Sequence, residues 1–381
     1  MGATSRRLPW PDVAKGLSIL GVIVLHVTLE VPGGMDTPLA VANAALDPIR
    51  MPLFFLISGF FAPKIFHFTF RELFLKRLWF LLVPYLIWVP IEQYLKGVER
   101  GLILGEPMPV FVTYVRNMAI GVNMAWFLYA LVTFNIALWL TRRLPPLVAM
   151  AMSFTPILAL SLHQEYHMVG KAILYLPLFF MGAHLKPVIA TYTQRCLEPL
   201  FLTATVALYG LGLVAVMVWR HLIASGPIVI PWYGPGMETM GVPEIELLVR
   251  LSAHLLMIGA GLTGAVLLSK VPVVSPLLQA IGRHTLPLYL GHPIALTLLY
   301  HIPVFRFEIL ISPEAEAWTQ ATETWVAIGL GICLLGGAVF YAISRIPVLG
   351  WCLAPPSLIR REKNSGPHAA ARTTIPAASN T

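Results

Sequence analysis

Long apolar runs separated by short polar segments repeat along most of the chain. Each run is long enough to cross the hydrocarbon core of a bilayer as an α-helix. The pattern predicts an all-α membrane protein, a bundle of about ten transmembrane helices. The expected helices lie at about residues 13–30, 49–66, 78–94, 124–140, 146–162, 169–185, 199–219, 247–269, 285–300 and 325–343.

Composition agrees with this pattern. Hydrophobic residues make up 57% of the 381 residues, charged residues make up 12%, and the mean hydropathy is +0.76. Soluble domains carry about twice that charged fraction, so the chain is expected to be a multi-pass protein of the cell membrane. We expect an integral membrane domain over residues 1–345 and a cytoplasmic tail over 346–381, disordered from about 364 because its residues there are small and polar.

Basic residues indicate the orientation. With ten crossings and a cytoplasmic N-terminus, most of the 26 Lys and Arg residues fall on the cytoplasmic side, as the positive-inside rule requires. An even number of crossings also places the C-terminus in the cytoplasm. The net charge of +8 is therefore interpreted as an orientation signal that also favours anionic lipid headgroups, and nucleic-acid binding is not expected.

A polar stripe runs along the first expected helix. It consists of Asp12, Lys15, Ser18, His26 and Glu30. Ionisable groups inside a membrane are costly, so they indicate a functional site. Lys15 and His26 are eleven residues apart, which places them on nearly the same helix face and roughly 16 Å apart along the axis. We expect His26 to act as a general base that Glu30, one turn beyond, orients. The alternative is that His26 only hydrogen-bonds a neighbouring helix.

Two further segments are candidates for binding. Ser58 and Gly59 lie in the second apolar run. Two adjacent small residues there favour close helix packing, and the alternative is that the Ser58 hydroxyl hydrogen-bonds an acyl donor. The following basic segment contains Arg71, Lys76 and Arg77. Such a cluster can hold phosphates through charge-assisted hydrogen bonds, although the positive-inside bias also explains single basic residues there.

Other candidate residues are less specific. In the ninth expected helix, Tyr289 and His292 are three residues apart and so share one face, for packing or for function. No spacing typical of a disulfide framework or of a metal site links the cysteines, and no metal is expected. They lie at Cys196, Cys333 and Cys352.

Several of these motifs together resemble the acyltransferase 3 family of integral membrane acyltransferases. Its first-helix pattern is an aspartate, a basic residue followed by glycine, and a histidine eleven positions after the basic residue, here Asp12, Lys15, Gly16 and His26. With lysine at position 15, where most of the family has arginine, the chain resembles the branch related to fucose 4-O-acetylase. The chain departs from the family pattern at Phe80, which stands where the family has a second arginine after Arg77. The other matching segments are 51–61, 76–78, 84–85, 126–128, 179–182 and 282–292.

This resemblance implies transfer of an acyl group, with acetyl-CoA as the expected donor, to a hydroxyl of an envelope carbohydrate or glycolipid. The basic segment, with Ser58, would bind CoA, and His26 would take the proton of the acceptor hydroxyl while Lys15, Asp12 and Glu30 support the site. Membrane lipids are further expected partners, and the oligomeric state is open. The alternatives are a transporter or flippase of a polar envelope precursor and a noncatalytic partner in a polysaccharide-assembly complex.

Overall fold

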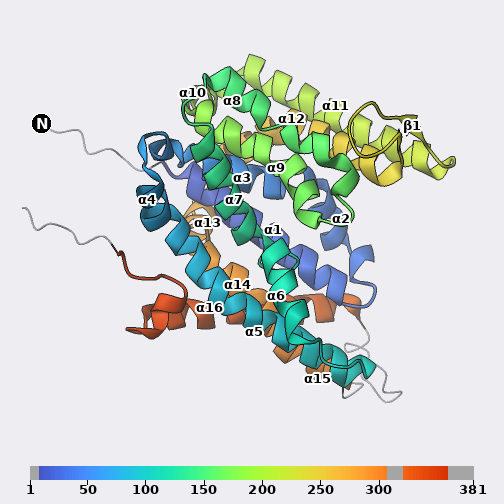
Figure 1. Ribbon diagram of the computed structural model, residues 1–381, viewed down its shortest axis with the longest axis vertical. Helices are drawn as coiled ribbons and strands as arrows, with labels where there is room; N and C mark the ends of the chain where they lie inside the picture. Colours follow the sequence, from blue (N-terminus) through green and yellow to red (C-terminus); the bar gives the residue numbers. More distant parts are fainter. Residues whose placement is uncertain (1–7, 307–320, 359–381) are drawn as a thin grey trace, which may run out of the picture.

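The computed structural model describes residues 8–306 and 321–358, and these form an almost entirely helical bundle (Figure 1). The expected disordered tail from 364 lies outside the described residues. The α-helices are α1 Trp10–Glu30, α2 Pro38–Ala45, α3 Asp47–Phe60, α4 Phe70–Leu73, α5 Trp79–Leu104, α6 Phe111–Ile120, α7 Trp126–Leu140, α8 Pro146–Met152, α9 His167–His184, α10 Lys186–Arg195, α11 Pro199–Ala224, α12 Val242–Leu268, α13 Val274–Arg283, α14 Thr285–Leu296, α15 Ile302–Arg306 and α16 Thr322–Arg345.

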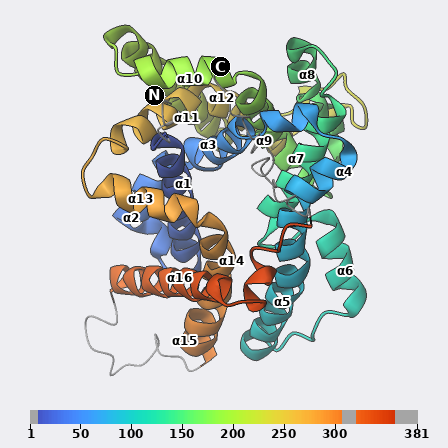
Figure 2. The ribbon, with the colours of Figure 1, turned by 90° about the vertical axis from the view of Figure 1, so that its left-hand side faces the viewer.

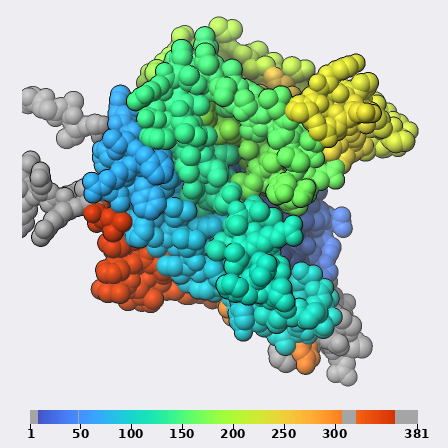
Figure 3. Space-filling view, viewed as in Figure 1, coloured from blue at the N-terminus to red at the C-terminus, as the bar shows by residue number. Residues whose placement is uncertain are grey.

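Short elements connect these helices. Strands β1 (Ile230–Pro231) and β2 (Thr239–Met240) pair antiparallel, and Figure 3 shows this region projecting from one corner of the molecule. Two π-helical turns, η3 (Phe74–Leu78) and η5 (Thr297–His301), continue directly into α5 and α15. The 3₁₀ turns are η1 Gly34–Asp36, η2 Pro63–His67, η4 Thr155–Leu162 and η7 Leu349–Cys352.

Among the described residues, six helices are long and apolar enough to cross a membrane. Two bent pairs, Pro38–Ala45 with Ile49–Phe60 and His167–His184 with Lys186–Arg195, raise this number to as many as eight. The all-α membrane class is therefore confirmed, whereas ten crossings and cytoplasmic termini stay predictions. The six are Trp10–Glu30, Phe70–Leu104, Pro199–Ala224, Val242–Leu268, Thr285–Arg306 and Thr322–Arg345.

Helix α1 lies between α3 and α13 (Figure 2) and packs against α3, α12, α13 and α14. Glycines let it approach α13 closely. A Cβ on Gly16 would collide with the carbonyl of Leu278, and a Cβ on Gly282 would collide with the carbonyl of Asp12. Small residues at a crossing let helix backbones touch, so these two glycines fix the N-terminal end of α1 against α13.

Helices α3 and α9 cross in the same way. A Cβ on Gly59 would collide with the carbonyl of Phe179, and a Cβ on Gly182 would collide with that of Leu56. Gly59 therefore has a packing role. This crossing also fixes the neighbouring Ser58, and with it one wall of the site described next.

Candidate active site

A cavity of about 370 Å³ opens between α1, α3, α5, α7 and α14. Its polar lining includes Lys15, Ser58, Lys76, Arg77 and Tyr289, and we call it the first cavity. Five candidates from the sequence thus come together on its wall, although they come from three separate segments of the chain: Lys15, Ser18, Ser58, Lys76 and Arg77. Much of the remaining lining is aromatic or aliphatic, so the space suits a long ligand with an apolar body and an anionic end.

Basic side chains gather at one part of this cavity. The Lys15 ammonium lies 5.1 Å from the centre of the Phe61 ring, and an Arg77 guanidinium nitrogen donates to the Phe61 carbonyl. Lys76 donates to the Glu72 carboxylate over 2.6 Å. Lys76 and Arg77 stand on the π-helical turn η3, and π-turns often occur at functional sites.

Local sequence explains how this basic turn is held. Thr69 caps α4, because its hydroxyl accepts from the Glu72 N–H over 3.2 Å and the Glu72 carboxylate accepts from the Thr69 N–H over 3.0 Å. Glu72 in turn holds Lys76. Arg71 lies on α4 too, but it is exposed and is not part of the cavity lining. The Ser58 hydroxyl donates to the Phe54 carbonyl over 2.8 Å, which leaves its oxygen free to accept a further bond.

His26 lies farther along α1 and pairs with a second histidine. Its Nδ1 is 2.9 Å from Nε2 of His292 on α14, and the two rings are stacked with their centres 5.1 Å apart. His292 is buried, whereas His26 is partly exposed. The sequence predicts that Glu30 orients His26, but in the structure the residue that hydrogen-bonds the His26 ring is His292.

The hydrogen bonds around this pair assign the tautomer of His26. Nδ1 of His292 lies 2.9 Å from the Leu288 carbonyl, which can only accept, so this nitrogen carries a proton. In a neutral imidazole the other nitrogen is then an acceptor, so Nε2 of His292 accepts a hydrogen bond from Nδ1 of His26. Nε2 of His26 is left with its lone pair, which is the state that a general base requires.

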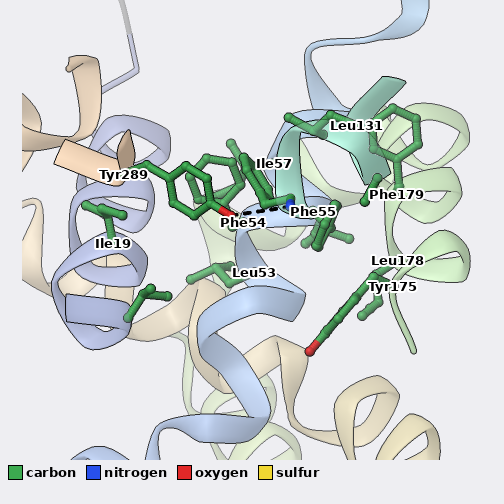
Figure 4. Close-up of a cluster of buried hydrophobic side chains, with 14 of the residues drawn as sticks. Ile19, Leu53, Phe54, Phe55, Ile57, Leu131, Tyr175, Leu178, Phe179 and Tyr289 are labelled. Carbon is green, nitrogen blue, oxygen red and sulfur yellow. Dashed lines mark hydrogen bonds between the residues drawn. The ribbon is translucent and has the colours of Figure 1, made fainter. Parts of the chain in front are cut away.

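Tyr289 connects the first cavity to the histidine pair. Its hydroxyl donates to the Met124 carbonyl over 2.6 Å and accepts from the Phe127 N–H over 3.3 Å. Figure 4 shows its ring extending from α14 toward Phe54 of α3. Tyr289 and Val22 both line the first cavity, and each lies about one helical turn from a member of the histidine pair.

Glu30 belongs to a separate cluster at the C-terminal end of α1. Its carboxylate lies 3.0 Å from Nε2 of His301 and 3.9 Å from the Lys96 ammonium. His301 also contacts Glu99. Asp12 is at the opposite end of α1, where it is buried in the first turn and is not part of the lining of the first cavity.

The sequence pattern does not identify the partners of these residues. It places Tyr289 and His292 on one face of a helix, but it does not pair either of them with another residue, and it does not select His301 or Glu99. The available signal is the presence of ionisable side chains within apolar runs. Over residues 8–306 and 321–358, no group of three His, Cys, Asp or Glu side chains is arranged to hold a metal ion.

Comparison with known proteins bears on the chemistry of this site. Searches of curated proteins and of solved structures find no match to the chain. The family model of acyltransferase 3, described as an acyltransferase domain, matches residues 8–345. This match spans both the first cavity and the histidine pair, and it supports a membrane acyltransferase. The chain belongs to the acyltransferase 3 family.

Proposed function

We propose that this protein transfers an acetyl group from acetyl-CoA to a hydroxyl of an envelope carbohydrate or glycolipid, with His26 as the general base. The observation that supports this best is the His26–His292 pair, whose hydrogen bonds leave Nε2 of His26 basic. It lies about one turn beyond a cavity whose lining includes three basic side chains. Family membership supports acyl transfer, and the residues supply the base and the anion-binding groups.

The donor is assigned to the first cavity. Lys15, Lys76 and Arg77 would hold the CoA phosphates, because charge-assisted hydrogen bonds to phosphate are strong. The pantetheine arm would run along the apolar wall past Ser58, whose hydroxyl oxygen can accept from an amide N–H. The thioester would then lie near Tyr289, at the part of the cavity closest to the histidine pair.

The transfer itself needs one proton acceptor. Nε2 of His26 takes the proton of the acceptor hydroxyl as that oxygen attacks the thioester carbonyl carbon. The new C–O bond forms, the C–S bond breaks, and CoA leaves as a thiolate that takes up the proton from His26. The imidazolium that forms meanwhile keeps its Nδ1–H bond to His292, so the ring does not need to turn during the step.

The same proposal includes the orientation of the chain. Ten crossings follow if the shorter apolar helices Trp126–Leu140 and Pro146–Leu162 also span the membrane. Both termini and the basic residues of the first cavity then face the cytoplasm, where acetyl-CoA is made, and Glu30 faces the other side. Lysine at position 15 favours the branch related to fucose 4-O-acetylase.

The test uses the full-length protein purified in lipid nanodiscs, with [acetyl-¹⁴C]CoA and an envelope glycan and glycolipid extract. We expect His26→Ala to lower acetyl transfer by about 10²–10⁴-fold, the usual contribution of a general base. His221→Ala, at the exposed C-terminal end of α11, is the matched control and should leave transfer unchanged. Ordinary transfer by a folded His26→Ala protein would overturn the assignment. A transporter would show no acetylated product.

A further inference from the structure

A second cavity of about 220 Å³ lies at the C-terminal end of α1, bounded by α5 and α15. Its lining includes Glu30, Glu99, Arg100, His301 and Phe305. The donor site described above uses none of these side chains. Ionisable groups gathered within membrane-spanning helices are costly and so usually mark a functional site, and this second cavity therefore needs its own explanation.

The charges of its lining are balanced by ion pairs, some of them with Lys96, which is not part of the lining. Nδ1 of His301 lies 2.5 Å from Glu99, and Nε2 lies 3.0 Å from Glu30. A neutral imidazole has only one N–H, whereas both nitrogens here face carboxylate oxygens, so His301 is an imidazolium. Lys96 lies 2.8 Å from Glu99. Two carboxylates therefore face two cations.

Arg100 does not disturb this balance. Its guanidinium lies 2.7 Å from the Glu106 carboxylate. An anionic ligand would meet Glu30 and Glu99, and a cationic ligand would compete with Lys96 and His301. The second cavity therefore suits a neutral ligand.

Two buried polar atoms on this wall lack an aligned hydrogen-bond partner among the described residues. They are Oε2 of Glu99 and Nε2 of His301. Both have an oppositely charged neighbour within ion-pair distance, Lys96 and Glu30 respectively. Buried polar groups in folded proteins almost always have hydrogen-bond partners. These ion pairs hold the two buried atoms, and the Glu30 side chain, which is 34% exposed, is the group that a ligand hydroxyl can reach.

The position of this cavity connects it to the proposed chemistry. Glu30 follows His26 by one helical turn, about 6 Å along the axis of α1. His301 stands on the π-helical turn η5, just as Lys76 and Arg77 stand on η3. Each cavity thus receives a basic side chain from a π-turn, and the histidine pair lies between the two.

We propose that the second cavity binds the acceptor as a neutral polyol, with neighbouring hydroxyls donating to the carboxylates of Glu30 and Glu99 and with Phe305 as an apolar wall. A further hydroxyl of the same molecule would then point toward His26. This assignment rests on the proposed acyl transfer, because only that reaction needs a hydroxyl next to His26.

Binding is measured first, because it does not depend on turnover. The probes are the methyl glycosides of glucose, galactose, mannose and fucose, with glucuronic acid and glucosamine as charged analogues, and the readout is saturation-transfer NMR of the full chain in nanodiscs. We expect at least one neutral glycoside to bind and both charged analogues to bind more weakly. Failure of all four glycosides to bind, or tighter binding of a charged analogue, would overturn the proposal.

Substitutions locate the bound glycoside. Glu99→Gln should weaken its binding about tenfold or more, the loss expected for one hydrogen bond to a charged group. Glu30→Gln should act in the same direction, and because its side chain is 34% exposed this variant serves if Glu99→Gln fails to fold. Glu246→Gln, an exposed carboxylate of α12 outside both cavities, is the matched control. Unchanged binding by both folded variants would place the glycoside elsewhere.

Kinetics with acetyl-CoA separate this proposal from the proposed function. For the glycoside that binds, Glu99→Gln should raise the acceptor KM about tenfold or more and leave the KM for acetyl-CoA unchanged. If wild-type protein transfers acetyl groups and this variant keeps the wild-type acceptor KM, the second cavity is not the acceptor site. If the glycoside binds in a Glu99-dependent way without any acetyl transfer, the acyltransferase reaction is wrong and the binding site is retained.

Discussion

Nε2 of His292 accepts a hydrogen bond from Nδ1 of His26, a residue 266 positions earlier in the chain. The bond joins α1 to α14 and, through the Leu288 carbonyl, sets which nitrogen of His26 is basic. His292 is therefore a positioning residue, which acts on the reaction through His26.

Replacing His292 separates positioning from packing. His292→Ala removes the acceptor for Nδ1 of His26, and we expect kcat to fall by about 10–100-fold, less than the loss of the base itself, with the KM for acetyl-CoA unchanged. His292→Gln can present an amide oxygen to the same N–H and should recover part of the rate. Equal rates for the two folded variants would show that the hydrogen bond does not matter.

The cationic side of the first cavity can be tested with donors that lack phosphates. Lys15→Gln and Arg77→Gln should each raise the KM for acetyl-CoA by about tenfold, the loss of one charge-assisted bond. The same variants should use S-acetyl-pantetheine as well as the wild type does. Arg195→Gln, whose guanidinium is exposed and paired with Glu198, is the control. A similar defect with both donors would mean that these residues do not bind the phosphates.

The close packing of α3 on α9 predicts that alanine substitutions at two glycines differ clearly in their effect on stability. Gly182→Ala places a methyl group against the Leu56 carbonyl, and overpacking of this kind costs about 1–3 kcal/mol in the free energy of unfolding. Gly264→Ala on α12 has nothing within 4 Å of the added carbon and should leave stability equal or slightly higher. Thermal unfolding of the two variants in the same nanodiscs measures this, and similar midpoints would contradict the crossing.

Orientation can be measured by cysteine labelling in whole cells. Tyr233 is 97% exposed beside the β1–β2 pair, so Tyr233→Cys should react with a membrane-impermeant maleimide added outside. Arg195→Cys, at the C-terminal end of α10 and four residues before α11 begins, should react only after permeabilisation. Both variants carry Cys352→Ser, because Cys352 is the least buried native thiol. The reverse pattern would invert the proposed topology and place the first cavity outside.

Residue order is enough to assign the class of the protein and one face of one helix. Long apolar runs specify membrane-spanning helices whatever they pack against, and helical periodicity alone placed Lys15 and His26 on a common stripe. The family motifs before Tyr85 likewise depend only on residue order, so Lys15, Ser58, Lys76 and Arg77 could be selected without knowing that they share a cavity.

Which side chains meet depends on how the helices pack. Glu30 follows His26 by one turn, yet it lies against His301, and His26 is paired with His292 instead. Helical periodicity fixes the direction of side chains on one helix, but the partner across an interface depends on where two helices cross. Here glycines such as Gly16 and Gly282 set one of those crossings through backbone contact. The π-helical turn that contains His301 changes the direction of that side chain, which the regular period of an α-helix cannot predict.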